Sequence, residues 1–320
     1  MALRTAMPSA APGTSKLKAY AKLGKLAFFD FYLCVLVVWT AVPGTELWAA
    51  GTWITLLLFL LGQVGVVAAT VAFDDLTGVR DGSDARNYTT ESEALRDLSR
   101  KPLLSGALTV QEAHRFAWAM ALWGALLWTA TAAFAPHRPL WGCVLLLYVA
   151  LTSVQYSYGL KLSYRGGQEL LLVSSASLVI VLPYALITGA TTGLIVLEAV
   201  LFGLWSVLVS LYSNMNDIEG DRLAGRRNLA TMTRPAAYRG VITVLTVAEP
   251  VAVVVAVAVG AVPWWFLAVT LPLFALRTVQ LRTGVVRRKA LAARVLGIKC
   301  QRLGVLLLMA GNVLVVHVAG

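Results

Sequence analysis

The stretch Asp217-Ile218-Glu219-Gly220-Asp221-Arg222-Leu223-Ala224-Gly225-Arg226-Arg227 comes shortly after an apolar run long enough to cross a bilayer. On a helix, Asp217 and Asp221 lie on one face, one turn apart. Carboxylates that close repel each other, and a cation between them would offset the repulsion. Mg²⁺ is the natural candidate, because it takes carboxylate oxygens and keeps substrate phosphates as further ligands.

A second acidic cluster, Asp74, Asp75, Asp81 and Asp84, follows another apolar run. Asp74 and Asp81 are seven positions apart, which is two helical turns and one face. Asp84 lies a further turn on, provided that the helix continues through Gly82. Two acidic clusters at the ends of membrane helices predict a metal-bridged diphosphate between them.

The composition is that of a membrane protein. Of the 320 residues, 58% are apolar and 13% are charged, whereas soluble domains carry about 25% charged residues. The net charge of +11 does not indicate nucleic-acid binding, because the basic residues fall in the loops between apolar runs. The three cysteines and three histidines are scattered, without disulfide or metal-ligand spacing.

The apolar runs predict an all-α membrane protein in which nine transmembrane helices form a bundle around a central cavity. We expect a single domain over residues 1–320, with a tail and a basic surface helix in 1–25 before the nine-helix bundle in 26–320. Pro183 and Pro250 are expected to kink their helices. The predicted spans are 27–44, 52–73, 113–135, 140–157, 170–188, 193–213, 240–259, 263–279 and 296–317.

Basic residues alternate between the two sides of the predicted bundle. The amino terminus and every second loop carry most of them, whereas the other loops hold Arg138 alone. The positive-inside rule then places the first set, with both acidic clusters, in the cytoplasm and the carboxyl terminus outside. The two acidic clusters are about 143 residues apart, which suggests two related halves.

Two further loops carry candidate phosphate-binding cations. Lys101 stands before a proline turn, where it can reach a phosphate oxygen. Tyr158 and Lys161 are three apart and can face one site from a helix end. The alternative interpretation of this pair is an interfacial tyrosine and a snorkelling lysine.

Together these motifs resemble the UbiA superfamily of intramembrane prenyltransferases over essentially the whole chain. Asp217-x-x-x-Asp221 with the following Arg222 and Ala224-Gly225 resembles the second aspartate-rich motif of the family. Lys101-Pro102-Leu103-Leu104-Ser105-Gly106 is similar to its Arg-Pro-Leu-x-Ser-Gly, and Tyr158-x-x-Lys161 to its Tyr-x-x-Lys. Ser163 to Gly166 and Ser213 to Asp217 look most like the menaquinone-pathway branch, which implies a bacterial plasma membrane.

The first motif departs from the family pattern. Asp74 stands where the family has Asn, and Gly78 where it has a further Asp. Asp81 and Asp84 are candidates to supply the missing charge. UbiA-type terpene cyclases are similar in carrying Gly or Ala at the Gly78 position.

The resemblance implies that Mg²⁺ helps an allylic prenyl diphosphate to ionise. The predicted metal ligands are Asp74, Asp75, Asp81, Asp84, Asp217 and Asp221. The predicted diphosphate-binding residues are Lys101, Lys161, Arg165, Arg226 and Asn214. The predicted catalytic residues are Asp74, Asp75, Asp81, Asp217, Asp221, Tyr158 and Lys161. Asp30, Glu198 and Glu249 lie in or near spans without an assigned role.

Three functions are compatible with these residues. The first is transfer of the prenyl group to a small-molecule acceptor, expected to be aromatic. The second is cyclisation of the prenyl diphosphate by the same ionisation. The third is cation transport, which predicts acidic residues near the bilayer midplane; here they cluster at one interface.

Overall fold

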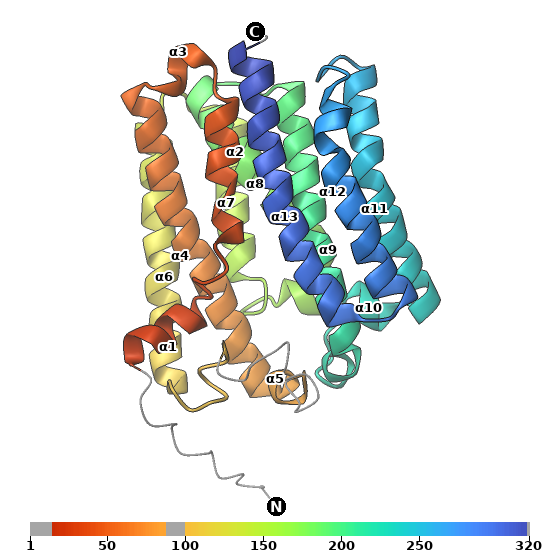
Figure 1. The fold of residues 1–320 in the computed structure, drawn as a ribbon. Helices are drawn as coiled ribbons and strands as arrows, with labels where there is room; N and C mark the ends of the chain where they lie inside the picture. The colour runs from red at the N-terminus through yellow and green to blue at the C-terminus, as the bar shows by residue number, and fades with distance from the viewer. Residues whose placement is uncertain (1–14, 88–99, 319–320) are drawn as a thin grey trace, which may run out of the picture.

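The protein is described here from a computed structural model, which covers residues 15–87 and 100–318. The described part of the chain is helical and contains no strand. Its long helices run side by side in one bundle (Figure 1). α1, α5 and α10 lie at one end of the bundle, whereas α3 and the end of α13 lie at the other, so the polypeptide enters and leaves at opposite ends (Figure 1). Residues 1–14 of the predicted tail lie outside the described residues.

A helix lies in each predicted span, although some helices extend beyond the predicted bounds and others cover only part of the span. Their bounds are α1 Lys16–Leu23, α2 Cys34–Ala41, α3 Gly44–Leu47, α4 Ala50–Asp81, α5 Ser83–Asn87, α6 Val110–Phe134, α7 Leu140–Val154, α8 Gln168–Thr188, α9 Gly193–Leu223, α10 Leu229–Met232, α11 Pro235–Ala258, α12 Phe266–Leu281 and α13 Ala290–Asn312. Single 3₁₀ turns cover Phe29–Tyr32 and Leu162–Tyr164, and π-helical turns cover Arg282–Val286 and Val313–Val318.

Within the described residues, six helices are long and apolar enough to cross a membrane. They are α4, α6, α8, α9, α11 and the segment Ala290–Val318. The other three predicted spans correspond to shorter helices: Phe29–Ala41, Leu140–Val154 and the 16-residue α12. The all-helical membrane architecture is therefore confirmed, whereas the count of nine crossings is not.

α4 and α9 organise the bundle. Their first residues, Ala50 and Gly193, are 143 positions apart, as the repeat of the acidic clusters indicates. Both helices continue beyond their apolar runs, so Asp74 and Asp81 belong to α4, and Asp217 and Asp221 to α9. Each aspartate pair therefore has the helical spacing that the sequence predicts.

Small residues bring α4 and α6 close together. A Cβ atom on Gly65 would lie 2.7 Å from the backbone nitrogen of Gly124, so the two backbones touch at this point. Such close approach is typical of membrane helices, in which van der Waals packing replaces the hydrophobic effect. α6 begins at a capping box, in which Thr109 and Glu112 bond to each other's backbone nitrogens.

A cavity of about 610 Å³ lies inside the bundle. Its walls come from α4, α7, α8, α9 and α13, and from the segment that joins α1 to α2. Tightly packed side chains that include Phe59, Trp128 and Phe202 close the bundle beyond it. The architecture thus includes the central cavity that the sequence predicts.

Candidate active site

Both acidic clusters open onto the same cavity. Asp74 and Asp84 line it from the first half of the chain, and Asp217 and Asp221 line it from α9. The two halves also meet directly, because Arg226 donates a 3.0 Å hydrogen bond from Nη2 to Asp74 Oδ1. One ligand in this cavity can therefore contact both clusters.

Asp74 is held by two donors. Ser157 Oγ donates to Asp74 Oδ1 at 2.6 Å, beside the bond from Arg226. Arg226 also donates to the hydroxyl oxygen of Tyr164 at 3.2 Å, and that hydroxyl donates to Asp81 Oδ2. Asp81 does not line the cavity; it acts on the site through Tyr164 and Arg226.

Lys101 joins the other two carboxylates of the first cluster. The side chain is buried, and its Nζ lies 2.7 Å from Asp75 Oδ1 and 2.8 Å from both oxygens of Asp84. Lys25 also reaches Asp75, at 3.5 Å. Asp75 lies behind the cavity wall, whereas Lys25 and Lys101 line the cavity. The negative charge of Asp75 therefore holds the two lysine side chains in position at the wall.

A glycine pair brings Asp84 into the site. Gly82 ends α4 in the left-handed conformation, with φ of 75°, and turns the chain into α5. Asp84 then folds back over Gly78, where a Cβ atom would lie 2.6 Å from Asp84 Cγ. The carboxylate of residue 84 thus occupies the space above residue 78, the position at which the first motif lacks its aspartate.

The environment of Asp84 disfavours its charged form. The pKa of its carboxyl is raised to about 6, mainly by burial and also by the neighbouring Asp75 and Asp74, against the lowering effect of Lys101. A cation bound beside Asp84 would favour the charged carboxylate.

Amide side chains position the second cluster. Asn228 Nδ2 donates to Asp221 Oδ2 at 2.8 Å, and Asn87 Nδ2 lies 3.5 Å from Asp221 Oδ1. Asn214 lines the cavity and accepts a 3.3 Å bond from Gln168. Asn216 donates to Asp217 at 3.1 Å. Asn87 therefore links the end of the first cluster to α9.

Besides Asp75 and Asp81, three predicted residues lie away from the cavity wall: Tyr158, Lys161 and Arg165. α7 ends at Val154, so Tyr158 and Lys161 do not share a helix face; Gly159 and Lys161 turn the chain with φ of 57° and 50°. Tyr158 stacks on Phe73 at 4.5 Å between ring centroids, and the amine of Lys161 lies 5.1 Å from the centre of the Tyr164 ring. Arg165 is exposed.

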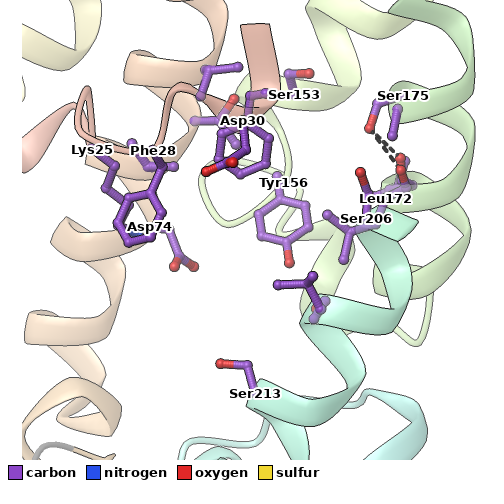
Figure 2. Close-up of a pocket in the computed structure, with 18 of the residues that line it drawn as sticks. Lys25, Phe28, Asp30, Asp74, Ser153, Tyr156, Leu172, Ser175, Ser206 and Ser213 are labelled. Carbon is purple, nitrogen blue, oxygen red and sulfur yellow. Dashed lines mark hydrogen bonds between the residues drawn. The ribbon is translucent and has the colours of Figure 1, made fainter. Parts of the chain in front are cut away.

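The structure adds residues that the sequence patterns did not single out. Tyr156 lines the cavity and faces the same space as Asp74 (Figure 2). Only the turn after α7 distinguishes Tyr156 from Tyr158, and no sequence pattern shows which ring points inward. Lys25, Ser157 and Tyr164 were missed for the same reason, since each reaches the site from a loop.

The intramembrane carboxylates separate into two kinds. Asp30 lines the cavity and is paired with Arg302. Glu249 is fully buried and accepts a 3.0 Å bond from Arg277 Nε, away from the cavity. Glu198 is also fully buried and away from the cavity.

The donor atoms of the site suit Mg²⁺. Within the described residues, no group of three or more His, Cys, Asp or Glu side chains is arranged to hold a metal alone. Mg²⁺ does not require one, because it is usually bound by one or two carboxylates together with water and substrate phosphates. Among the described residues, three buried polar atoms of cavity-lining side chains have no hydrogen-bond partner: Gln168 Oε1, Asn214 Nδ2 and Arg226 Nε. The site therefore fits a divalent cation that binds with a phosphate ligand.

Comparison with known proteins gives a fold and a family. A structure of a UbiA homolog from Archaeoglobus fulgidus bound to GPP and Mg²⁺ superposes with a TM-score of 0.63 at 15% identity, covering 91% of this chain and 99% of that one. The apo UbiA homolog from Aeropyrum pernix K1 gives 0.64 at 14% identity, with 91% and 98% covered. A structure from work on digeranylgeranylglyceryl phosphate synthase gives 0.59 at 15% identity, with 94% and 99% covered.

No curated protein matches this chain. At these identities the solved structures establish the fold alone. The model of the UbiA prenyltransferase family, however, matches residues 36–315, nearly the whole chain. The chain therefore belongs to the UbiA prenyltransferase family.

Proposed function

We propose that the protein ionises an allylic prenyl diphosphate in this cavity and transfers the prenyl group to a small-molecule acceptor. The observation that carries the proposal is the convergence of both acidic clusters on one cavity, tied by the bond between Asp74 and Arg226. UbiA homologs from Archaeoglobus fulgidus have been seen with DMAPP or GPP and Mg²⁺, which supports the same class of substrate here.

The cations of the site would bind the diphosphate. Arg226, Lys101 and Lys25 line the cavity beside the carboxylates, where they would neutralise the leaving oxygens as negative charge develops. Asn214 would add an amide donor from α9. Lys161 and Arg165 would approach from the cytoplasmic rim.

The carboxylates would hold Mg²⁺ between the two halves of the chain. The candidate ligands that line the cavity are Asp74, Asp84, Asp217 and Asp221. When bound, Mg²⁺ supplies Lewis-acid stabilisation of the leaving diphosphate. Asp75 and Asp81 would act in support, by positioning Lys101 and Tyr164.

The inner part of the cavity would protect the allylic cation. Val66, Val149 and Val179 line it, and such an apolar wall would help to keep out the water that would otherwise quench the cation. Tyr156 presents an aromatic ring to this space, and an aromatic face attracts a cation. Tyr158 would support the site from behind, through its stack on Phe73.

The cavity wall favours a polar acceptor over cyclisation alone. Ser153, Ser206 and Ser213 line the side that faces Asp74 (Figure 2), and hydroxyl groups can orient an acceptor that carries oxygen substituents. Terpene cyclisation is the second candidate function, favoured by glycine at position 78. We place the site at the cytoplasmic end of a nine-span bundle in the plasma membrane, as the positive-inside rule indicates.

The test is diphosphate release by the purified protein, with Mg²⁺ and allylic prenyl diphosphates, with and without aromatic acceptors. We expect release that depends on Mg²⁺ and on acceptor, with a prenylated product. Cyclic hydrocarbons or alcohols formed without an acceptor would show that the protein is a terpene cyclase and would refute prenyl transfer. Ion flux in proteoliposomes without any diphosphate release would refute both enzymatic functions.

A further inference from the structure

Glu198 is a buried acidic side chain at the end of the bundle opposite the aspartate clusters. It lies in the second turn of α9, nineteen positions before Asp217, which at 1.5 Å per residue is about 29 Å along the helix. The side chain is 0% exposed, and neither carboxyl oxygen has a hydrogen-bond partner within the described residues. Burial without a donor is costly for a carboxylate, but not for a carboxylic acid that can donate its own proton.

Asn312, the last residue of α13, is the polar side chain beside Glu198. Its side chain interacts with the Glu198 carboxyl and is itself 0% exposed. The amide Nδ2 donates to the carbonyl oxygen of Val37 at 3.1 Å and to Thr40 Oγ1 at 3.2 Å, both on α2. A carboxamide nitrogen carries two hydrogens, so both are used. The amide Oδ1 has no partner in the described part of the chain.

The carbonyl group of Val37 fixes the orientation of this amide. A carbonyl oxygen can only accept hydrogen bonds, so Asn312 must direct its nitrogen toward Val37 and its oxygen elsewhere. The Thr40 hydroxyl directs its own hydrogen to the carbonyl oxygen of Val37 or Leu36, at 2.9 and 3.0 Å. What Asn312 can still offer to Glu198 is therefore an acceptor. Two acceptors form a hydrogen bond only when one of them carries a proton.

No positive charge compensates an ionised Glu198. Apart from the neighbouring amide, no side chain of the described residues acts electrostatically on its carboxyl. The titratable groups of the surrounding elements supply none: Tyr184 of α8 lies within range of both Glu198 and Glu46, and His317 donates from Nε2 to a backbone carbonyl oxygen at 3.0 Å. A carboxylate here would be an unpaired charge inside a membrane bundle, which is strongly unfavourable.

We propose that Glu198 is a proton-binding site, a neutral carboxylic acid whose O–H donates to Asn312 Oδ1. This bond joins α9 to α13, and the amide nitrogen of Asn312 continues the link to α2. The three helices pack in this order, α9 against α13 and α13 against α2 (Figure 1). A proton is favoured over Mg²⁺ or Ca²⁺, because these ions take six or more oxygens, whereas Glu198 and Asn312 together offer three unpartnered ones. The site does not depend on the proposed reaction.

Glu249 provides the matched comparison. It is also 0% exposed in a long apolar helix, α11, but Arg277 Nε donates to it at 3.0 Å. Replacement by glutamine therefore has opposite consequences at the two positions. At position 198 the amide replaces a neutral acid and keeps a hydrogen-bond donor. At position 249 it removes the negative charge that compensates a buried arginine.

The test combines thermal unfolding with infrared spectroscopy on the full-length protein in lipid nanodiscs. Glu198→Gln should leave the unfolding midpoint within about 2 °C of the parent, whereas Glu198→Ala and Glu249→Gln should each lower it by more than about 5 °C. At about pH 7 an ordinary glutamate is ionised. The parent should nevertheless show the carbonyl band of a protonated carboxylic acid, which Glu198→Gln loses and Glu249→Gln keeps.

Each result decides the proposal. Absence of the acid band from the parent, or its survival in Glu198→Gln, would overturn it. So would a glutamine variant that is as unstable as Glu198→Ala or does not fold, because the amide would then fail to replace the acid. If Na⁺ or Ca²⁺ raises the unfolding midpoint of the parent but not that of Glu198→Gln, the carboxylate binds a metal ion and no proton. If Glu198→Ala does not fold, the spectra of the parent and the glutamine variant still decide.

Discussion

Replacing Gly78 by alanine should damage metal binding without damaging the fold. A Cβ atom at this position would lie 2.6 Å from Asp84 Cγ, 2.7 Å from Oδ2 and 2.9 Å from Oδ1. All three atoms belong to the end of one side chain, so Asp84 can move away from α4 without a shift of the backbone, and the buried Lys101 keeps Asp75 as its partner. The alanine itself favours the helix by about 1 kcal/mol relative to glycine. We therefore expect thermal stability to stay the same or rise slightly.

The displaced Asp84 carboxylate would leave Lys101 and the cavity. Loss of a group that orients a metal site typically weakens metal affinity by about 10- to 100-fold, or about 1.4–2.7 kcal/mol. The assay is a Mg²⁺ titration of diphosphate release, with thermal unfolding measured on the same samples. The half-saturating Mg²⁺ concentration should rise by that factor in Gly78→Ala.

Two further variants test the reasoning. Gly240→Ala is the control, because this glycine is also in a helix and a Cβ atom there has no neighbour within 4 Å. It should leave the Mg²⁺ titration unchanged. Gly78→Asp combined with Asp84→Ala returns a carboxylate to the motif position and should restore activity that Asp84→Ala alone loses. A normal Mg²⁺ titration for Gly78→Ala would refute the assigned role of Asp84.

Three other predictions follow from the same structure. Asp217→Asn and Asp221→Asn should each reduce diphosphate release by more than about 100-fold, since each removes a negative charge and one oxygen from a proposed metal ligand. Circular dichroism and thermal unfolding should stay close to the parent, and normal turnover in either variant would show that this residue is not a metal ligand. Chelation with EDTA should abolish diphosphate release, and added Mg²⁺ should restore it. Calorimetry should show that EDTA also weakens binding of the prenyl diphosphate. Unchanged binding after chelation would contradict a site shared by the metal and the diphosphate. Arg277→Met should cost about 3–5 kcal/mol of unfolding free energy in SDS titrations, because it leaves Glu249 buried and unpaired. Arg302→Met should cost less, because Arg302 is half-exposed and its partner Asp30 lines the cavity; equal effects would show that burial does not govern these pairs.

Much of this protein could be predicted from local sequence. Apolar runs predict membrane helices, because backbone groups in lipid must be satisfied within the segment itself. The carboxylates at the ends of two such runs predict where the chemistry lies, since aspartates four and seven positions apart share a helix face. Both aspartate pairs are helical in the structure, and both clusters line one cavity.

Helix length was harder to predict than helix position. The runs around residues 27–44 and 140–157 are as apolar as the others, yet their helices cover only Cys34–Ala41, after a 3₁₀ turn, and Leu140–Val154. Hydropathy reports which residues can lie in lipid, whereas turn geometry decides where a helix stops. In the second case, Gly159 adopts a left-handed conformation and the Gln155 side chain accepts a bond from the Leu160 nitrogen.

The residue types that we propose for diphosphate binding could be identified from the sequence alone, because charge in an apolar chain is costly and therefore visible as a pattern. Which of them meet was decided only by the tertiary structure. Asp84 reaches the site because Gly82 reverses the chain over Gly78, and Tyr156 faces the cavity because a turn rotates it there. The hydrogen bond between Asp74 and Arg226 joins residues 152 positions apart. Only the packing of the bundle brings these two side chains together, so no local sequence pattern can predict the contact.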